Sequence, residues 1–139
     1  MQYIYMSEHY KEDRPWGSYE ILTEFKVDEP GFLDVAVKRL TVKPGQRPSY
    51  QSHKQRNEHW YVVQGQGTVT LNDQDIPVKV GSFIDVKVGD KHRIMNSSTD
   101  KDLIFIEIQT GHYDEDDIVR YSDDYGPRTE TGYRGKFTT

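Results

Sequence analysis

From residue 32 to residue 109 the sequence consists of short segments rich in Val, Ile and aromatic residues, separated at regular intervals by turn-forming residues. Leu33, Val35 and Val37 share one face of the first segment, because successive side chains of a strand alternate between faces. Clusters such as Gly65-Gln66-Gly67 end the segments. Strands and turns spaced this regularly predict a closed or sandwiched all-β domain.

The expected strands cover residues 18–25, 32–42, 50–53, 58–64, 68–71, 76–80, 83–86, 93–96 and 103–109. Residues 72–75 are rich in Asn and Asp and predict a hairpin turn. The acidic cluster from Asp114 to Asp117 could begin a short helix running toward Arg120, because carboxylates favour a helix N-terminus. The 139 residues suffice for one domain. We expect an N-terminal arm at residues 1–13, which docks on the domain or on a partner subunit, a domain at 14–126 and a C-terminal tail at 127–139.

Charge and composition exclude several classes of function. The net charge of −5 and the lack of any basic run argue against nucleic acid as a partner. Cysteine is absent, which removes disulfides, thiolate nucleophiles and Cys-based zinc sites, and is most simply explained by a cytoplasmic location. The N-terminus does not resemble a secretory signal, and the longest clearly apolar stretch, Leu103 to Ile106, is too short to span a membrane. We therefore expect a soluble protein without a membrane partner.

Four polar residues have the spacing of a metal site. Gln51 and His53 are two apart, so both side chains leave the same face of a strand. Glu58 follows a four-residue turn, where a hairpin would set it opposite His53. His92 begins a later strand that a barrel could bring alongside this hairpin. One amide oxygen, two imidazoles and one carboxylate suit zinc, manganese, cobalt or iron. Taken alone, each of these residues is more simply explained as an ordinary polar turn residue.

The same residues stand inside a longer pattern. Gly45-x5-Gln51-x-His53-x4-Glu58-x6-Gly65 resembles the first cupin motif, and Gly81-x7-Gly89-x2-His92-x3-Asn96 resembles the second. Five blocks are similar to the type II phosphomannose isomerase domain, usually the C-terminal part of a bifunctional mannose-1-phosphate guanylyltransferase: residues 14–19, 37–45, 51–53, 56–60 and 116–120. The resemblance extends from Arg14 to Gly126. It implies a double-stranded β-helix, the cupin jelly-roll barrel, holding one divalent ion, with zinc as the first candidate.

The family resemblance also implies an activity, the isomerisation of mannose 6-phosphate to fructose 6-phosphate through an enediolate. Arg120 resembles the catalytic arginine of the family and could bind the phosphate or steady the enediolate. Lys38 is a second catalytic candidate, and Arg39 and Arg47 are candidates for binding phosphate, since these residues lie on or near the strand that leads to the site. For Lys38, Arg39 and Arg47, a solvated surface charge is an equal alternative. No general base is identified.

Some positions depart from the family pattern. Gln51 replaces the histidine of most cupins, but phosphomannose isomerases use glutamine here. Gln55 stands where relatives often have histidine, Lys87 replaces a proline, and Pro127 interrupts a Tyr-Gly-Arg ending, which makes Arg128 a doubtful equivalent. These departures keep open a cupin that retains the metal but only binds a sugar or sugar nucleotide. A cupin oxygenase is a further alternative, which an amide ligand at position 51 disfavours.

Strand geometry removes His59 from the ligand set. If Glu58 faces the metal, His59 faces away together with Tyr61 and Val63, whereas Trp60 and Val62 face the core or the pocket. Apolar residues on an outer face suggest that a second subunit covers it, which predicts a homodimer.

Overall fold

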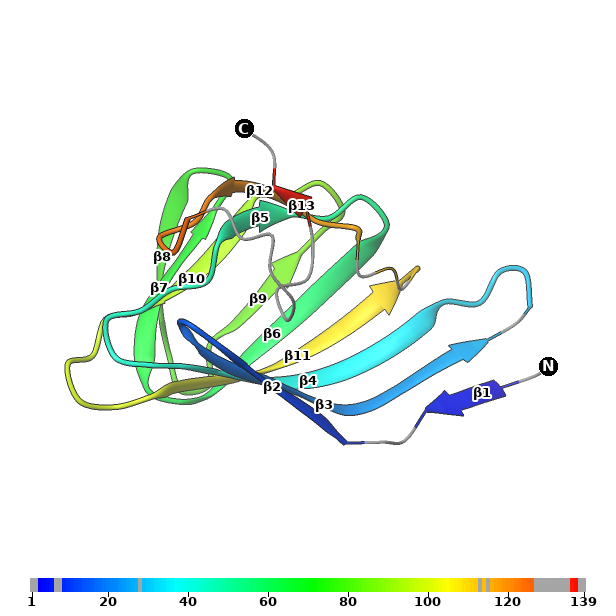
Figure 1. Ribbon diagram of the computed structural model, residues 1–139, viewed down its shortest axis with the longest axis horizontal. Coiled ribbons are helices and arrows are strands. Elements are labelled where there is room, and N and C mark those ends of the chain that lie inside the picture. Colours follow the sequence, from blue (N-terminus) through cyan, green and yellow to red (C-terminus); the bar gives the residue numbers. More distant parts are fainter. Residues whose placement is uncertain are drawn as a thin grey trace.

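The computed structural model of the protein describes residues 3–6, 9–27, 29–112, 114, 116–126 and 136–137. Figure 1 shows two β-sheets that face each other and enclose a barrel interior. The strands are β1 (Tyr3–Met6), β2 (Tyr10–Arg14), β3 (Gly17–Val27), β4 (Asp34–Val42), β5 (Tyr50–Ser52), β6 (Arg56–Gln64), β7 (Gln66–Leu71), β8 (Gln74–Lys79), β9 (Phe83–Val86), β10 (His92–Asn96), β11 (Leu103–Gly111), β12 (Val119–Ser122) and β13 (Lys136–Phe137). The described residues form no helix, so the all-β prediction is confirmed.

The two sheets have different strand orders. The first sheet runs β1-β3-β4-β11-β6-β9, with β2 paired to β3, and the second runs β13-β12-β5-β10-β7-β8. All pairs are antiparallel except β12 with β13. Neighbours in a sheet are often distant in the sequence, as in the pairing of β4 with β11. This arrangement is the double-stranded barrel that the sequence predicts.

The predicted hairpin between β5 and β6 is wrong. The strand β5 pairs with β10 and β12 in one sheet, whereas β6 pairs with β11 and β9 in the other. The turn at residues 53–55 therefore carries the chain from one sheet to the opposite one. As a result, His53 and Glu58 meet across the barrel interior rather than side by side along a hairpin.

The segment after β11 also differs from the prediction. The helix expected to run toward Arg120 does not form in the described residues, since residues 119–122 are the strand β12. The side chain of Asp117 instead accepts hydrogen bonds from the backbone N–H groups of Lys54 and Gln55 at 2.8 and 2.9 Å. The Asp117 carboxylate therefore caps the turn that follows β5 instead of starting a helix.

Both chain ends contribute strands. The expected N-terminal arm contains β1 and most of β2, and each of these strands pairs with β3 of the same chain. Within the expected tail, residues 136–137 pair with β12 as β13. The other tail residues, among them Pro127 and Arg128, lie outside the described residues.

The apolar core contains side chains from both sheets. Val42, Val69 and Leu103 are fully buried, and Trp60 packs its ring on Phe105 with centroids 5.0 Å apart. Burying one side chain of this size contributes about 1.5 to 3 kcal/mol. The pairing register of β6 and β11 then sets Glu58 opposite Gln109, at the end of β11 away from Leu103. Glu58 and Gln109 are therefore polar side chains buried next to this core.

A two-residue turn supports the loop before β10. Asn72 and Asp73 have φ values of 48° and 67°, which match the left-handed conformation that Asn and Asp tolerate in tight hairpins. The expected hairpin is confirmed, with the turn narrowed to these two residues between β7 and β8. The side-chain oxygen of Asn72 accepts the backbone N–H of Lys91 at 2.9 Å. The hairpin thus fixes the backbone immediately before His92.

Strand alternation in β6 follows the prediction. The exposed fractions of Tyr61 and Val63 are 48% and 43%, whereas Trp60 and Val62 are buried.

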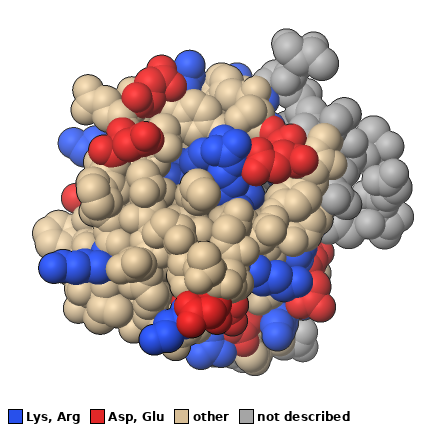
Figure 2. Space-filling view, turned by 90° about the vertical axis from the view of Figure 1, so that its left-hand side faces the viewer, with Lys and Arg blue, Asp and Glu red and all other residues tan. Residues whose placement is uncertain are grey.

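On the face of the molecule shown in Figure 2, basic and acidic side chains are intermixed, without an extended patch of one sign. In the part of the chain that the structure describes, no helix has the length and apolar character needed to cross a membrane.

Candidate metal centre

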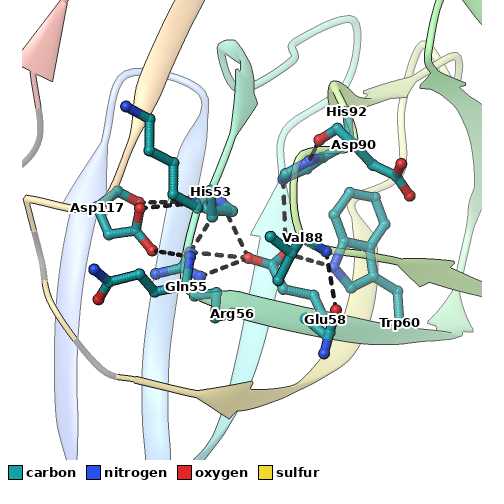
Figure 3. Close-up of polar contacts among 11 residues, drawn as sticks. His53, Gln55, Arg56, Glu58, Trp60, Val88, Asp90, His92 and Asp117 are labelled. Carbon is teal, nitrogen blue, oxygen red and sulfur yellow. Dashed lines mark hydrogen bonds and ion pairs between the residues drawn. The ribbon is translucent and has the colours of Figure 1, made fainter.

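Three of the four predicted ligands converge inside the barrel. His53, Glu58 and His92 are each at most 4% exposed, and one potential ligand atom from each lies within 4.8 Å of the others. The Nε2 atom of His53 is 3.1 Å from Glu58 Oε2, and Nε2 of His92 is 3.7 Å from Glu58 Oε1 (Figure 3). His92, Ile94 and Asn96 share the buried face of β10, as predicted. The cluster thus combines two imidazole nitrogens and a carboxylate in a site shielded from water.

Backbone carbonyls fix the orientation of both imidazoles. The Nδ1 atom of His53 lies 2.7 Å from the carbonyl oxygen of Asp117, and Nδ1 of His92 lies 2.9 Å from that of Asp90. A carbonyl oxygen only accepts hydrogen bonds, so each Nδ1 carries the proton and each Nε2 presents its lone pair to the centre of the cluster. Metal-binding histidines are commonly held in this way. The two imidazole nitrogens and the Glu58 carboxylate therefore fit a divalent metal ion in chemistry and in orientation.

The charge states in the cluster suit metal binding. Burial alone would raise the pKa of Glu58, but the Arg56 guanidinium beside it holds that pKa well below its usual value. Glu58 Oε1 also accepts a hydrogen bond from Trp60 Nε1 at 3.0 Å. Burial lowers the pKa of His92 to about 4, so this imidazole is neutral at pH 7. An ionised carboxylate and a neutral imidazole are the forms that bind metals.

Gln51 lies beside this cluster. On β5 it is the direct pairing partner of His92 on β10 and of Arg120 on β12, so the three residues form one row across the second sheet. Gln51, His92 and Arg120 all line the main cavity of the protein. The place of Gln51 agrees with its predicted role as a metal ligand, which stays a prediction.

The main cavity is rich in charged side chains. Its cations are Arg14, Lys38, Arg56, Arg93 and Arg120, and its carboxylates are Glu58 and Glu107. Lys38 on β4 pairs directly with Glu107 on β11. Desolvation lowers the pKa of Lys38. Burial and the nearby Glu58 carboxylate raise the pKa of Glu107 to about 8. An excess of cations over carboxylates in a cavity favours an anionic ligand.

Two residues that were predicted to bind phosphate, Arg39 and Arg47, do not line the main cavity. Arg39 donates two hydrogen bonds to the Glu20 carboxylate at 2.6 and 2.9 Å, and its side chain is 45% exposed. Arg47 binds the Asp124 carboxylate at 2.8 and 3.0 Å. The residues that line the main cavity include neither of them. Their assignment to phosphate stays an untested prediction, and the cavity geometry does not support it.

The cavity also contains cations that the sequence did not single out. Arg14 belongs to a block used for the family resemblance, but nothing in that block indicated that its side chain faces the cavity. Arg14 forms an ion pair with Glu12 at 2.7 Å, and its guanidinium lies 5.6 Å from the Tyr19 ring centre. Arg93 directly follows His92, so alternation alone would place it outside the barrel. It is only 8% exposed, because its guanidinium binds the backbone oxygen of Pro48.

The exclusion of His59 from the cluster is supported by the structure. Its side chain is 43% exposed, and its Nδ1 atom pairs with Asp85 on the neighbouring strand β9. The ring of Phe83 lies 5.8 Å away, centre to centre. His59 is therefore on the outer face of the first sheet, on the opposite side from the metal-binding cluster.

Comparison with known protein families assigns the chain to one of them. The family described as mannose-6-phosphate isomerase C-terminal matches residues 3–123. The chain belongs to this family. The family resemblance inferred from the sequence motifs is thereby confirmed.

Relatives of this mannose-6-phosphate isomerase C-terminal domain are longer bacterial proteins. The xanthan biosynthesis protein XanB of Xanthomonas campestris pv. campestris is 40% identical over 119 residues, which cover 85% of this chain and 24% of that protein. The alginate biosynthesis protein AlgA of Pseudomonas aeruginosa is 40% identical over 123 residues, covering 88% of this chain and 24% of AlgA. The mannose-1-phosphate guanylyltransferase ManC of Salmonella typhimurium is 37% identical over 119 residues, covering 85% of this chain and 23% of ManC. The chain thus spans about a quarter of the length of these relatives.

Solved structures agree on the fold of the domain. KdgF from Halomonas sp. superposes with a TM-score of 0.62 at 19% identity, over 76% of this chain and 89% of that chain. An RmlC-like cupin from Shewanella frigidimarina gives a TM-score of 0.61 at 16% identity, over 76% and 86%. A putative sugar phosphate isomerase from Acidithiobacillus ferrooxidans gives 0.52 at 25% identity, over 56% and 51%. The mannose-6-phosphate isomerase C-terminal domain therefore has the cupin fold, as predicted.

Proposed function

We propose that this chain is a metal-dependent sugar-phosphate isomerase that interconverts mannose 6-phosphate and fructose 6-phosphate. The observation that carries the proposal is the buried His53, Glu58 and His92 cluster, which lines a cavity rich in cations. Membership of the mannose-6-phosphate isomerase C-terminal family supports the choice of substrate. Zinc is our first candidate for the ion, with manganese, cobalt and iron as the others.

The reaction moves a proton between C1 and C2 of the sugar through an enediolate. A divalent ion held by His53, Glu58 and His92 would polarise the sugar oxygens and stabilise the negative charge that develops on them. We assign Gln51 to the same ligand set. A neutral amide in place of a second carboxylate leaves the site with a larger net positive charge, which suits this electrostatic task.

The remaining cavity residues provide substrate binding. Arg120 is buried in the row that contains Gln51 and His92, which supports a role for its planar guanidinium in binding the phosphate or the enediolate through two hydrogen bonds. Lys38 approaches the same cavity from the opposite sheet. Arg14 and Arg93 add positive charge to the cavity wall. Substrate phosphate would thereby be attracted to the cavity and oriented by more than one cation.

A coupled assay tests the activity. Purified protein supplied with zinc, cobalt or manganese should convert mannose 6-phosphate to fructose 6-phosphate. The variant His53→Ala should abolish turnover, whereas His59→Ala, a matched change on the outer face, should leave most of it. If none of these ions supports turnover, the isomerase proposal is refuted.

A binding protein is the second candidate. Gln55 and Lys87 depart from the family pattern, which favours a domain that retains the metal but only binds a sugar or sugar nucleotide. Metal binding without turnover, together with saturable binding of a sugar phosphate or sugar nucleotide, would support this candidate. Oxygen uptake by the iron-loaded protein would instead indicate a cupin oxygenase.

A further inference from the structure

Arg56 contacts two members of the metal-binding cluster. Its Nε and Nη2 atoms donate hydrogen bonds to Glu58 Oε2 at 3.0 and 2.8 Å, and Nη2 also lies 3.1 Å from His53 Nε2 (Figure 3). The side chain is 14% exposed. It begins on β6, and it lines both the main cavity and a smaller one at the ends of β4 and β11. A permanent cation is thus located where a metal would bind.

The conflict between this arginine and a metal can be assigned to one atom. His53 Nδ1–H donates a hydrogen bond to the Asp117 carbonyl, and Nε2 faces Arg56 Nη2, which can only donate, so Nε2 presents its single lone pair. Arg56 Nη2 uses that lone pair as a hydrogen-bond acceptor, and a metal ion would need the same lone pair. Glu58 Oε2 has further lone pairs and can accept from Arg56 Nε while it also contacts a metal. Metal binding therefore requires Nη2 to leave His53 but lets Arg56 keep its bond to Glu58.

A buried acceptor is present close to Arg56. Gln109 on β11 pairs directly with Glu58 on β6, is 3% exposed, and lines the smaller cavity together with Arg56. Its Oε1 atom has no hydrogen-bond partner among the residues that the structure describes. A buried carbonyl oxygen without a donor is costly, so this atom favours an approaching N–H group. The guanidinium of Arg56 can provide one.

We propose that Arg56 is a two-position cation that competes with the metal for His53 and turns toward Gln109 Oε1 when a divalent ion binds. In the first position the guanidinium partly neutralises the Glu58 carboxylate and occupies the His53 lone pair. In the second position it leaves both imidazoles to the metal and satisfies a buried oxygen. Arg56 thereby lowers the affinity of the site for metal, and Gln109 partly restores it. The inference rests on the metal site of the proposed function but not on its catalytic activity.

The first test measures metal affinity. Arg56→Met keeps an unbranched side chain and removes the charge and all donors. Isothermal titration with Zn²⁺ and with Mn²⁺ should give a dissociation constant about tenfold lower than that of the unchanged protein, because a charge-assisted competitor is lost. Lys54→Met removes one positive charge from an exposed residue of the same turn and should change the constant by less than about twofold. Unchanged or weaker binding by Arg56→Met overturns the proposal, since Arg56 would then only support Glu58.

The second test concerns the alternative position. Gln109→Met removes the acceptor and should weaken metal binding by roughly threefold to tenfold while Arg56 is present. In the Arg56→Met background the same change should have almost no effect, because no guanidinium then needs the acceptor. Equal weakening in both backgrounds would refute the role of Gln109. Thermal unfolding curves confirm that each variant folds, and Arg56→Gln replaces Arg56→Met if the latter does not.

These measurements use the metal alone and are independent of turnover. Tight metal binding without isomerase activity would refute the proposed function and leave the two-position arginine standing. Isomerase activity combined with an unchanged metal affinity in Arg56→Met would refute the two-position arginine and leave the proposed function standing. If neither the unchanged protein nor Arg56→Met binds a divalent ion, the inference about Arg56 is wrong.

Discussion

The backbone carbonyl of Asp117 accepts a hydrogen bond from His53 Nδ1–H, although the two residues are 64 positions apart. The carboxylate of the same residue binds the backbone N–H groups of Lys54 and Gln55, which follow His53 directly. One residue thus holds both the imidazole and the turn on which it stands. Asp117 also precedes Ile118 and Arg120, which line the main cavity. The metal-binding and substrate-binding parts of the proposed site are therefore joined at Asp117.

We expect Asp117→Ala to weaken metal binding by about tenfold, in the range measured for residues that orient metal ligands. The variant keeps the backbone carbonyl but frees the turn that positions His53. Isothermal titration with Zn²⁺ provides the measurement. Asp116→Ala removes a neighbouring exposed carboxylate and serves as the control. Equal affinities for the two variants would show that the Asp117 carboxylate does not position His53.

Metal removal should lower the thermal stability of the protein. A ligand present at about 100 times its dissociation constant stabilises the native state by about 2.7 kcal/mol, which corresponds to roughly 10 °C in a domain of this size. Scanning calorimetry of the chelator-treated and zinc-loaded protein measures this shift. His92→Ala should lose it, whereas His112→Ala, whose side chain is 65% exposed, should retain it. A full shift in His92→Ala would exclude His92 from the ligand set.

The outer face of the first sheet is expected to form a homodimer interface. Phe83 on β9 and Tyr61 on β6 are direct pairing partners, with exposed fractions of 63% and 48%, and Ile108 on β11 is 41% exposed. Phe83→Glu should convert a dimer to a monomer in size-exclusion chromatography with light scattering, because the charge would be buried in the interface. Met95→Glu, on the second sheet, should leave the dimer intact. A monomeric unchanged protein would refute the prediction.

One ion pair should make stability depend on pH. Hydrogen bonds from Arg39 hold the pKa of Glu20 below its ordinary value. Because the folded-state pKa is the lower one, the pair stabilises the fold above the unfolded pKa of about 4.3, and this contribution is lost as the pH falls through the folded pKa. Urea unfolding should therefore show a difference between the unchanged protein and Glu20→Gln that is constant above about pH 5 and shrinks below it. Arg39→Met should remove the larger part of the same pH-dependent contribution, because His9 also contacts the Glu20 carboxylate at 3.1 Å. A difference that does not shrink at low pH would contradict this assignment.

Strand alternation accounts for most of what the sequence could predict. The predicted segments overlap the observed strands from β3 to β11, and the two-residue period places His59 outside and Trp60 inside. The same argument, applied to β4, would have separated Lys38 from Arg39, because adjacent residues of a strand face opposite sides. Lys38 lines the cavity, and Arg39 lies outside it at Glu20. Strand alternation in β4 therefore separates a cavity residue, Lys38, from a surface residue, Arg39.

Pairing between sheets could not be predicted from local spacing. A four-residue connection between His53 and Glu58 fits a hairpin as well as a crossing between facing sheets, and both bring the two side chains together. The partners of β5 are decided by contacts with β10 and β12, which lie far away in the chain. Burial of Arg93 likewise depends on Pro48, from a distant loop. Long-range contacts of this kind leave no periodic signal in the sequence.

The potential metal ligands come from both sheets. Glu58 belongs to β6 in the first sheet, His92 belongs to β10 in the second, and His53 follows β5 of the second sheet. An ion held by these three side chains would tie the two halves of the barrel together next to Trp60, the core residue that donates a hydrogen bond to Glu58. In a chain without a single cysteine, such an ion would be the counterpart of a disulfide, a cross-link that forms or dissolves with the supply of metal.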